Sequence, residues 1–204
     1  MENVITDILN PGKFRIVLAS QSPRRRELLS QLGLSFEVAS KDVDESFPPH
    51  LHPADAARYI AERKAREFSG DWPDALVITA DTIVTIDGQI LGKPADAAAA
   101  RGMLHRLSGR AHEVITAVAF SWQGQIHVFH ETTEVRFRAL ATWEIEHYIT
   151  NYRPFDKAGA YGIQEWIGMA AIETVTGSYT NVVGLPTARV YQELQRIAGV
   201  LLRA

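Results

Sequence analysis

Residues 75–81 read ALVITAD, an unbroken apolar run that ends in the acid Asp81. A run of this kind is typical of a strand that is buried on both faces. Strands of that type belong to sheets covered by helices, so the run predicts the centre of an α/β fold. Asp81 is expected at the point where this strand runs out.

The flanking segments complete this α/β pattern. Helical and strand periodicities alternate on both sides of the run, and Asp87-Gly88 is a strong signal for a two-residue hairpin. The expected strands lie at 14–19, 36–38, 82–86, 89–91 and on both sides of Gln123-Gly124. The expected helices lie at about 23–32, 53–68, 95–107, 142–151 and 186–202, with a Gly-rich loop at 156–168. We therefore predict one mixed α/β domain over residues 14–204, a twisted sheet flanked by helices, after a short extension at 1–13.

Composition limits the classes of function. The 204 residues carry a formal net charge of −3, so no overall positive field attracts nucleic acid. The absence of cysteine excludes disulfides, thiolate metal sites and cysteine nucleophiles. No apolar run reaches the roughly 20 residues that cross a bilayer, and residues 1–13 lack the pattern of a signal peptide. We expect a cytoplasmic protein with no nucleic-acid or membrane partner.

Three arginines stand where a helix is expected to start. Ser22-Pro23 predicts an N-cap followed by proline at the first helical position, and Arg24, Arg25 and Arg26 come next. Cations in a first turn oppose the helix dipole and cost on the order of 0.3–1 kcal/mol each. A bound anion would offset this cost, because guanidinium groups and free backbone N–H groups hold phosphate oxygens. The alternative is a solvated basic turn.

A lysine occupies the apolar face of the helix predicted at 53–68. Spacings of three to four residues place Lys64 on one stripe with Ile60, Ala61 and Phe68. The side chain either extends to the edge of the core or points into a cleft to meet a negative charge.

Acidic side chains are candidates for a hard-metal site. In open α/β sheets, ligands collect outside the carboxyl ends of strands, where Asp81 is expected. An acid there can coordinate a metal or take a proton from water. Asp44 and Glu45, in an earlier loop, add carboxylates suited to Mg²⁺ or Mn²⁺. The alternatives are an aspartate that bonds its own turn and an ordinary polar loop.

Further candidates lie in loops. Lys93, before a predicted helix, and Lys157, in the Gly-rich loop, either reach a phosphate or are surface lysines. The seven histidines lack the spacing of metal ligands, and Ser20 and Ser22 lack a catalytic triad. Neither the P-loop nor the dinucleotide-binding fingerprint occurs, so a phosphate site must be of another design.

These segments resemble the signature stretches of the Maf family, the septum-formation-inhibitor-like nucleoside triphosphate pyrophosphatases. The resemblance runs from about Arg15 to the C-terminal helix, with the motifs in the family's order. The matching motifs are ASQSPRR at 19–25, Asp44-Glu45, Lys64-Ala65, ADTIV at 80–84, Gly92-Lys93-Pro94, Ser108-Gly109, DKAGAYGIQ at 156–164, GSY at 177–179 and NVVGLP at 181–186.

The resemblance implies an elongated α/β fold like that of the inosine triphosphate pyrophosphatases, with a cleft between two lobes. It also implies a homodimer and cleavage between the α- and β-phosphates with a divalent cation, Mg, Mn or Co. Asp81 matches the catalytic acid that activates water, and Asp81 and Glu45 match carboxylates of the metal site. The residues that match the substrate-binding group are Ser20, Arg24, Arg25, Lys64, Thr82, Lys93 and Gln164.

Within the family, the chain is similar to the branch that acts on dTTP and UTP rather than on 7-methyl-GTP. The deciding positions are Arg24, Thr82 and Gln164. Two positions depart from the family pattern. Glu165-Trp166 replaces the small residue that usually follows the glutamine, and Thr187 stands where an apolar residue is typical. The first departure borders the expected base pocket, so the favoured pyrimidine nucleotide stays open.

The resulting hypothesis is metal-dependent hydrolysis of a nucleoside triphosphate to the monophosphate and pyrophosphate. The rival is a non-catalytic, nucleotide-sensing regulator of cell division or shape. Asp81 favours catalysis, because a sensor needs the basic groups but not an acid at the end of a strand. The physiological substrate, the preferred metal and any role in septum formation stay open.

Overall fold

The computed structural model describes residues 15–201, and its centre is a seven-stranded mixed sheet. The strand order is β2-β1-β3-β5-β6-β7, and β4 pairs with β3 off this path. β1 runs parallel to β2 and β3, whereas the other pairs are antiparallel. The strands are β1 (Arg15–Ala19), β2 (Glu37–Ala39), β3 (Ala75–Ile86), β4 (Gln89–Leu91), β5 (Ala111–Trp122), β6 (Gln125–Phe137) and β7 (Ile172–Thr176). The predicted mixed α/β sheet is confirmed, and the extension predicted at 1–13 lies outside the described residues.

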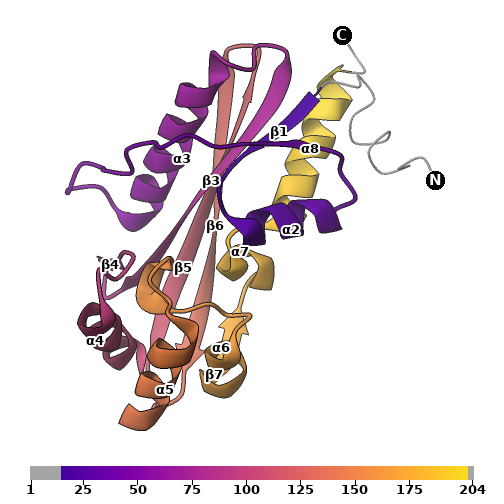
Figure 1. The fold of residues 1–204 in the computed structure, drawn as a ribbon. Helices are drawn as coiled ribbons and strands as arrows, with labels where there is room; N and C mark the ends of the chain where they lie inside the picture. Colours follow the sequence, from indigo (N-terminus) through magenta and orange to yellow (C-terminus); the bar gives the residue numbers. More distant parts are fainter. Residues whose placement is uncertain (1–14, 202–204) are drawn as a thin grey trace.

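Helices cover both faces of this sheet and form two groups at its ends (Figure 1). One face packs against α3, while on the other face α2 and α8 cover one end and α4, α5 and α6 the opposite end. No helix within residues 15–201 is long and apolar enough to cross a membrane. The helices are α2 (Pro23–Gln31), α3 (Pro53–Ser69), α4 (Ala97–Leu107), α5 (Thr142–Tyr152), α6 (Trp166–Ala171), α7 (Tyr179–Val183) and α8 (Thr187–Leu201), with a 3₁₀ turn at Ala158–Ala160.

The central strand β3 is buried on both faces, as its apolar run predicts. Leu76 and Ile78 pack in the core with α2 and α8, whereas Val84 and Ile86 pack in the core with α4 and α5. The prediction that this strand runs out at Asp81 is wrong. β3 continues to Ile86 because β5 pairs with it from Val77 to Thr85, so Asp81 lies in mid-strand.

One edge of β3 changes neighbours at the middle of the strand. β1 pairs with β3 only as far as Ile78, and β4 pairs with it only from Val84 onward. Between these two ladders, no other described strand lies on that edge of residues 79–83. Successive side chains of a strand point to opposite faces, so Asp81 projects toward the side of α3 and Thr82 toward the side of α2. The gap leaves both side chains accessible from one edge.

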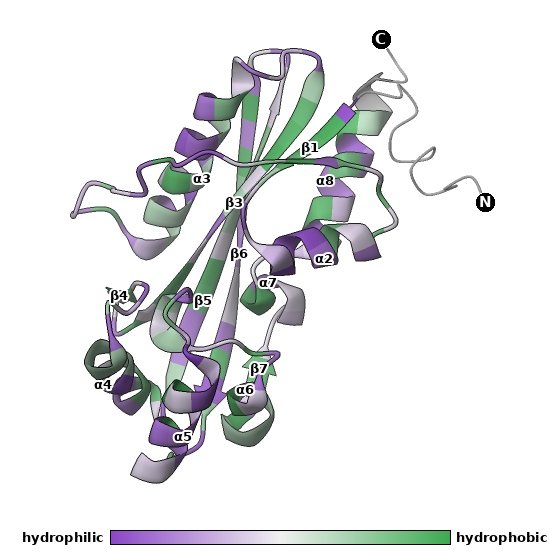
Figure 2. Ribbon diagram, viewed as in Figure 1, coloured by the Kyte–Doolittle hydropathy of each residue, from purple (hydrophilic) through white to green (hydrophobic). Residues whose placement is uncertain are grey.

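Local signals place most of the other elements where the sequence predicts them. The Ser22 hydroxyl caps α2 by accepting the Arg25 N–H at 3.4 Å, and α2 is largely hydrophilic (Figure 2). Asp87 and Gly88 take φ values of 53° and 74°, which suit a tight hairpin between β3 and β4. The loop expected at 156–168 differs, because it contains the 3₁₀ turn and the start of α6. β7 and α7 were not predicted, since five residues carry too little periodicity.

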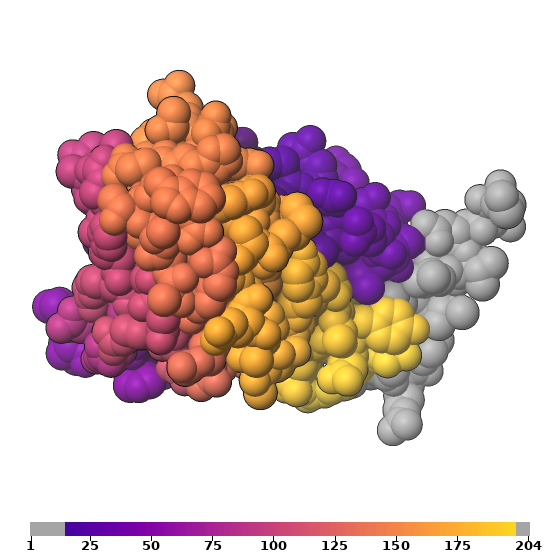
Figure 3. Space-filling view, turned by 90° about the horizontal axis from the view of Figure 1, so that it is seen from below, coloured from indigo at the N-terminus to yellow at the C-terminus, as the bar shows by residue number. Residues whose placement is uncertain are grey.

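The segment after α6 returns along the molecule between its two ends. Viewed from the end that carries α5, the amber residues lie between the orange region and the indigo N-terminal region, and the yellow residues lie beside the indigo region (Figure 3). Val182 and Val183 of α7 pack against the core below α4 and α5, and Leu185 belongs to the core of α2 and α8. This return places backbone groups of residues 181–184 beside β3 and α2.

Gly159 joins two loops at the middle of the sheet. Its N–H donates to the Gly92 carbonyl at 3.1 Å, and its φ is +68°, a left-handed value. A Cβ at this position would lie 2.9 Å from Cγ1 of Val84. The glycine therefore permits a close approach that holds the loops carrying Lys93 and Lys157 against β3.

Gly159→Ala is expected to lower the unfolding free energy by about 2–4 kcal/mol, combining left-handed backbone strain with overpacking. The matched control is Gly102→Ala in α4, where a Cβ meets nothing within 4 Å. That change should raise the unfolding free energy by about 0.5–1 kcal/mol, because alanine favours the helix. Urea unfolding of both variants checks the prediction, and equal stabilities would contradict it.

Candidate active site

A cavity of about 710 Å³ opens at the gap in the edge of β3. Ala80, Asp81, Thr82 and Val84 of this strand line it, and both groups of helices contribute side chains. Every residue predicted for the site lines this one cavity: Ser20, Arg24, Arg25, Glu45, Lys64, Asp81, Thr82, Lys93 and Gln164. Residues from distant parts of the chain therefore converge as the sequence predicts.

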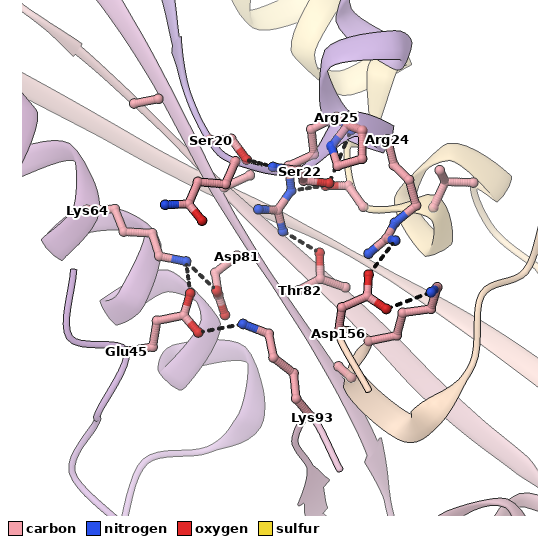
Figure 4. A pocket seen from close by; sticks show the side chains of 18 of the residues that line it. Ser20, Ser22, Arg24, Arg25, Glu45, Lys64, Asp81, Thr82, Lys93 and Asp156 are labelled. Carbon is pink, nitrogen blue, oxygen red and sulfur yellow. Dashed lines mark hydrogen bonds and ion pairs between the residues drawn. The ribbon is translucent and has the colours of Figure 1, made fainter. Parts of the chain in front are cut away.

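Two lysines and two carboxylates form a continuous ion-pair cluster on one side of the cavity (Figure 4). Nζ of Lys64 lies 2.8 Å from Oδ1 of Asp81 and 2.7 Å from Oε1 of Glu45. Nζ of Lys93 lies 3.0 Å from Oε2 of Glu45. Lys64 thus points into the cavity and meets negative charge, as one of the two predicted alternatives has it, rather than extending only to the edge of the core.

Arg25 lies on the opposite side of Asp81 and is held by the C-terminal return of the chain. Its Nε donates to the Gly184 carbonyl at 2.8 Å, and an Nη donates to the Thr82 hydroxyl at 3.0 Å. The Thr116 hydroxyl uses its only proton on the Asn181 carbonyl, at 2.8 Å. Thr82, 3.0 Å from that hydroxyl, must therefore donate to Thr116 and accept from Arg25.

The remaining arginines of the first turn of α2 diverge. Arg24 reaches across the cavity, where its Nη1 lies 3.1 Å from Oδ2 of Asp156. Arg26 is exposed and lies outside the cavity lining. The Ser20 hydroxyl accepts the Ser22 N–H at 3.2 Å and shapes the turn before the helix. Two of the three arginines thus face the cavity, and the third fits the alternative of a solvated surface residue.

Burial and charge act on the carboxylates in opposite directions. Asp81 is only 8% exposed, and burial raises its pKa, although the nearby charges of Lys64 and Arg25 oppose the rise. Glu45 is more open. Partial burial raises its pKa, but the hydrogen bonds and charges of Lys64 and Lys93 outweigh this effect and lower the pKa to about 2. Burial also lowers the pKa of the Arg25 guanidinium.

Two further candidates from the sequence have other partners in the structure. Asp44 lines the cavity, but its oxygens accept the Ser46 N–H at 2.8 Å and an Arg63 Nη at 2.9 Å. Lys157 is buried and not a surface lysine, with its Nζ 2.7 Å from Oδ1 of Asp156. Gln164 is exposed at the rim of the cavity.

Asp81 and Glu45 are the carboxylates best placed to bind a divalent cation. They share the ammonium of Lys64, so both lie on one side of the cavity. No group of three His, Cys, Asp or Glu side chains within residues 15–201 is arranged to hold a metal. This donor set suits Mg²⁺, which one or two carboxylates and substrate phosphates commonly bind in proteins. The residues present therefore fit a metal that arrives with a phosphorylated ligand.

Sequence reasoning gave no role to the polar residues that hold the cations in place. Asp156 links Arg24 to Lys157, and Thr116 and Asn181 support Thr82 and Arg25. Asp156 directly precedes a lysine in the Gly-rich loop, which was a usable signal. Thr116 and Asn181 belong to stretches that match the family, but Thr116 lies in an apolar strand and Asn181 acts through its backbone carbonyl, so no local pattern showed what they do.

Fold and cavity together define an α/β protein with a cation-lined pocket built around a buried acid. Residues 15–197 match the family described as Maf-like protein. The chain belongs to this family.

Named relatives cover nearly the whole chain. It is 47% identical over 190 residues to the "dTTP/UTP pyrophosphatase" of Phocaeicola vulgatus, covering 92% of this chain and 98% of the relative. It is 48% identical over 190 residues to the protein of that name from Porphyromonas gingivalis, covering 91% and 96%.

Two solved structures are also similar. The Ham1 protein of Staphylococcus aureus has a TM-score of 0.44 and 15% identity, covering 60% of this chain and 71% of that one. A HAM1 protein of Coxiella burnetii has a TM-score of 0.46 and 16% identity, covering 94% and 100%.

Asp81→Asn is expected to raise the unfolding free energy at about pH 7.5 in metal-free buffer. The pKa of Asp81 is raised above its ordinary value of 3.8, so its ionised form costs stability in the folded state. The cost is absent at a pH below the pKa of Asp81 in the unfolded chain and is complete above its pKa in the folded protein. The difference in unfolding free energy between the variant and the wild type should therefore shrink as the pH falls toward 4. Urea unfolding at several pH values measures it.

Glu144→Gln is the matched control with the opposite sign. The pKa of Glu144 is lowered to about 2, chiefly by its hydrogen bonds with Arg138, so its ionised form stabilises the fold. The variant should be less stable at about pH 7.5, and this deficit should vanish as the pH falls from the ordinary pKa of 4.5 toward 2. A loss of stability in both variants at neutral pH would contradict the interpretation of Asp81.

Proposed function

We propose that the protein hydrolyses nucleoside triphosphates, with dTTP and UTP as the expected substrates, to the monophosphate and pyrophosphate. The observation that carries this proposal is the convergence of Arg24, Arg25, Lys64 and Lys93 on one cavity with the buried Asp81. Four cations match the charge of a triphosphate, and an acid among them supplies a group for proton transfer. The names of the closely similar relatives support the same substrates.

The four cations approach the cavity as two pairs from different sides, so each pair can bind a different part of the triphosphate. Arg24 and Arg25 come from the first turn of α2, whose backbone N–H groups add to their attraction for an anion. Lys64 and Lys93 approach from α3 and the loop after β4, on the side of Asp81. Fixed cations of this kind stabilise the charge that develops on the leaving pyrophosphate, and they need no reorganisation during the reaction.

Asp81 is the group that we assign to accept the proton of the attacking water. Its raised pKa makes it a stronger base than an exposed aspartate, and Lys64 orients one of its oxygens at 2.8 Å. The oxygen of the water forms a bond to the α-phosphorus while the bond from that phosphorus to the bridging oxygen breaks. The electron pair of the broken bond leaves with pyrophosphate.

Asp81 and Glu45 would hold the divalent cation, Mg, Mn or Co. A bound cation of this type polarises phosphoryl oxygens and lowers the pKa of water. Binding requires Lys64 to share or give up its contacts with the two carboxylates, since the ammonium and the metal use the same oxygens.

Base recognition is assigned to Gln164, whereas Thr82 supports a phosphate-binding arginine. The Gln164 amide offers both a donor and an acceptor at the rim of the cavity, as the edge of a pyrimidine requires. Thr82 acts by holding Arg25. A single domain over 14–204 and a cytoplasmic location stay predictions of the sequence, and a homodimer stays a prediction of the resemblance.

A panel of nucleotides with Mg²⁺, Mn²⁺ and Co²⁺ tests the reaction, with phosphate detected in the presence and absence of added inorganic pyrophosphatase. Pyrophosphate release requires the added enzyme for a signal, whereas phosphatase chemistry gives a signal without it. Binding of dTTP with no turnover would instead support the nucleotide-sensing regulator.

Asp81→Asn is expected to lower kcat by about a thousandfold, because general base catalysis contributes roughly 10²–10⁴-fold. The matched control is Asp87→Asn at the hairpin that follows β3, where the carboxylate pairs with Arg110 on the surface. Steady-state rates with dTTP should leave that variant at the wild-type level. An Asp81→Asn enzyme with wild-type kcat would remove this residue from the mechanism.

Arg24→Ala is expected to raise KM for dTTP by roughly 10- to 100-fold, because the loss of a hydrogen bond to a charged group weakens binding by about that factor. The neighbouring Arg26→Ala removes the same charge from the same helical turn but outside the cavity lining. It should leave KM within about twofold, so the pair separates a direct contact from a general electrostatic effect. Equal effects of the two substitutions would count against the assigned contact.

A further inference from the structure

Glu165 lies directly after the proposed base-reading residue and is held at both of its carboxylate oxygens. Oε2 accepts a short hydrogen bond from the Tyr148 hydroxyl, and Oε1 lies 3.1 Å from Nζ of Lys157. All three side chains are largely removed from solvent, with Tyr148 fully buried, Lys157 9% exposed and Glu165 21% exposed. A carboxylate with this little exposure and two fixed partners has little rotational freedom.

Tyr148 connects this carboxylate to the other end of the same loop. Its hydroxyl accepts the Gly162 N–H at 3.0 Å while it donates to Glu165. Burial, followed by the contact with Glu165, raises the pKa of Tyr148, so the phenol stays protonated and able to donate. One side chain of α5 therefore clamps both ends of the segment that contains Gln164.

The backbone of this segment is also closely packed. The Glu165 N–H donates to the Gly162 carbonyl at 3.0 Å, and the Gly168 N–H donates to the Glu165 carbonyl at 2.9 Å. A Cβ at Gly162 would lie 3.0 Å from Cδ of Glu165, and a Cβ at Gly168 would lie 1.7 Å from the Ile163 carbonyl oxygen. The main chain on both sides of Gln164 is thus held by hydrogen bonds and close packing, while the Gln164 side chain is exposed at the rim of the cavity.

Glu165 also takes part in the charge balance at this side of the cavity. Lys157 is shared between Glu165 and Asp156, and Asp156 in turn contacts Arg24. Without the negative charge of Glu165, Asp156 alone would balance the two cations Lys157 and Arg24. Its effect on phosphate binding should be small, because its own contacts are to Tyr148 and Lys157 rather than to the four proposed phosphate-binding cations.

We propose that Glu165, clamped by Tyr148 and Lys157, is a positioning residue that sets the place of Gln164 and thereby the affinity for the pyrimidine base. This inference rests on the proposed function, since it assigns a second residue to the selection of the same substrate. It acts on the base and not on the triphosphate. The affinity for a ligand that has the phosphates but no base should not depend on Glu165.

Glu165→Gln tests this division, because the amide keeps the size of the side chain and removes its charge. We expect KM for dTTP and UTP to rise about tenfold, kcat to stay within about twofold, and the inhibition constant of inorganic tripolyphosphate to stay unchanged. Tyr148→Phe removes the hydroxyl that donates to Glu165. It should likewise raise KM for dTTP and UTP and leave kcat and the inhibition constant of tripolyphosphate unchanged. Loss of affinity for tripolyphosphate equal to that for dTTP, or unchanged affinity for both in the two variants, would overturn the proposal.

A double-substitution cycle with Gln164→Ala separates positioning from a general loss of packing. If Glu165 acts through Gln164, then Glu165→Gln should add no more than about twofold to KM once Gln164 is alanine. A full, additive tenfold effect in that background would overturn the proposal. Thermal unfolding of each variant provides the control for the fold.

Calorimetric titration in EDTA separates this inference from the proposed function. It measures Kd of the full-length protein for dTTP and for tripolyphosphate without turnover. A wild-type protein that binds dTTP but hydrolyses no nucleotide would refute the proposed reaction. The positioning role would then be tested by the Kd values for dTTP and tripolyphosphate alone. A selective loss of dTTP affinity in Glu165→Gln supports the role, and an equal loss for both ligands, or no dTTP binding by the wild type, overturns it.

Discussion

The site depends on a constraint within β3, which must stay buried while one of its edges changes partners. β5 pairs with β3 along almost its whole length, so the strand cannot end where its other neighbour does. Pairing of β3 with β1 ends at Ile78 and its pairing with β4 begins at Val84, and the edge of the five residues between them faces the cavity. Successive side chains of one strand, Asp81 and Thr82, thereby reach a single cavity from opposite faces of the sheet, which an ordinary sheet interior prevents.

Each charge around this gap would cost folding free energy if it were buried alone, and the opposite charges around it offset that cost. Asp81 is a buried acid whose pKa is raised, and Arg25 is a cation whose pKa burial lowers. Lys64 links Asp81 to Glu45, and Glu45 links Lys64 to Lys93, so each of these four charges has an opposite neighbour. Cations that oppose the dipole of α2 are part of the same arrangement, which fits a cavity built to receive an anion.

The two ends of the molecule contribute different chemistry to the cavity. The end with α2 and α3 supplies Arg24, Arg25 and Lys64, whereas Lys93 comes from the loop after β4. Gln164 and the residues that hold it come from α5 and the loop that follows it. Arg24 and Asp156 are in contact across the cavity. This contact continues through Lys157 to Glu165, so it links the groups assigned to the phosphates with those assigned to the base.

Local sequence determined the elements whose signals lie within a few residues. These are the buried run of β3, the Ser22 cap, the Asp87-Gly88 hairpin and the stripe that turns Lys64 inward. Tertiary structure alone decided that β3 continues past Asp81, that Asp44 is bound by Arg63 and that Lys157 is buried between two carboxylates. Capping, turns and helical periodicity are short-range and can be found from neighbouring residues. Strand length and ion-pair partners depend on groups brought close only by folding, and no local pattern encodes them.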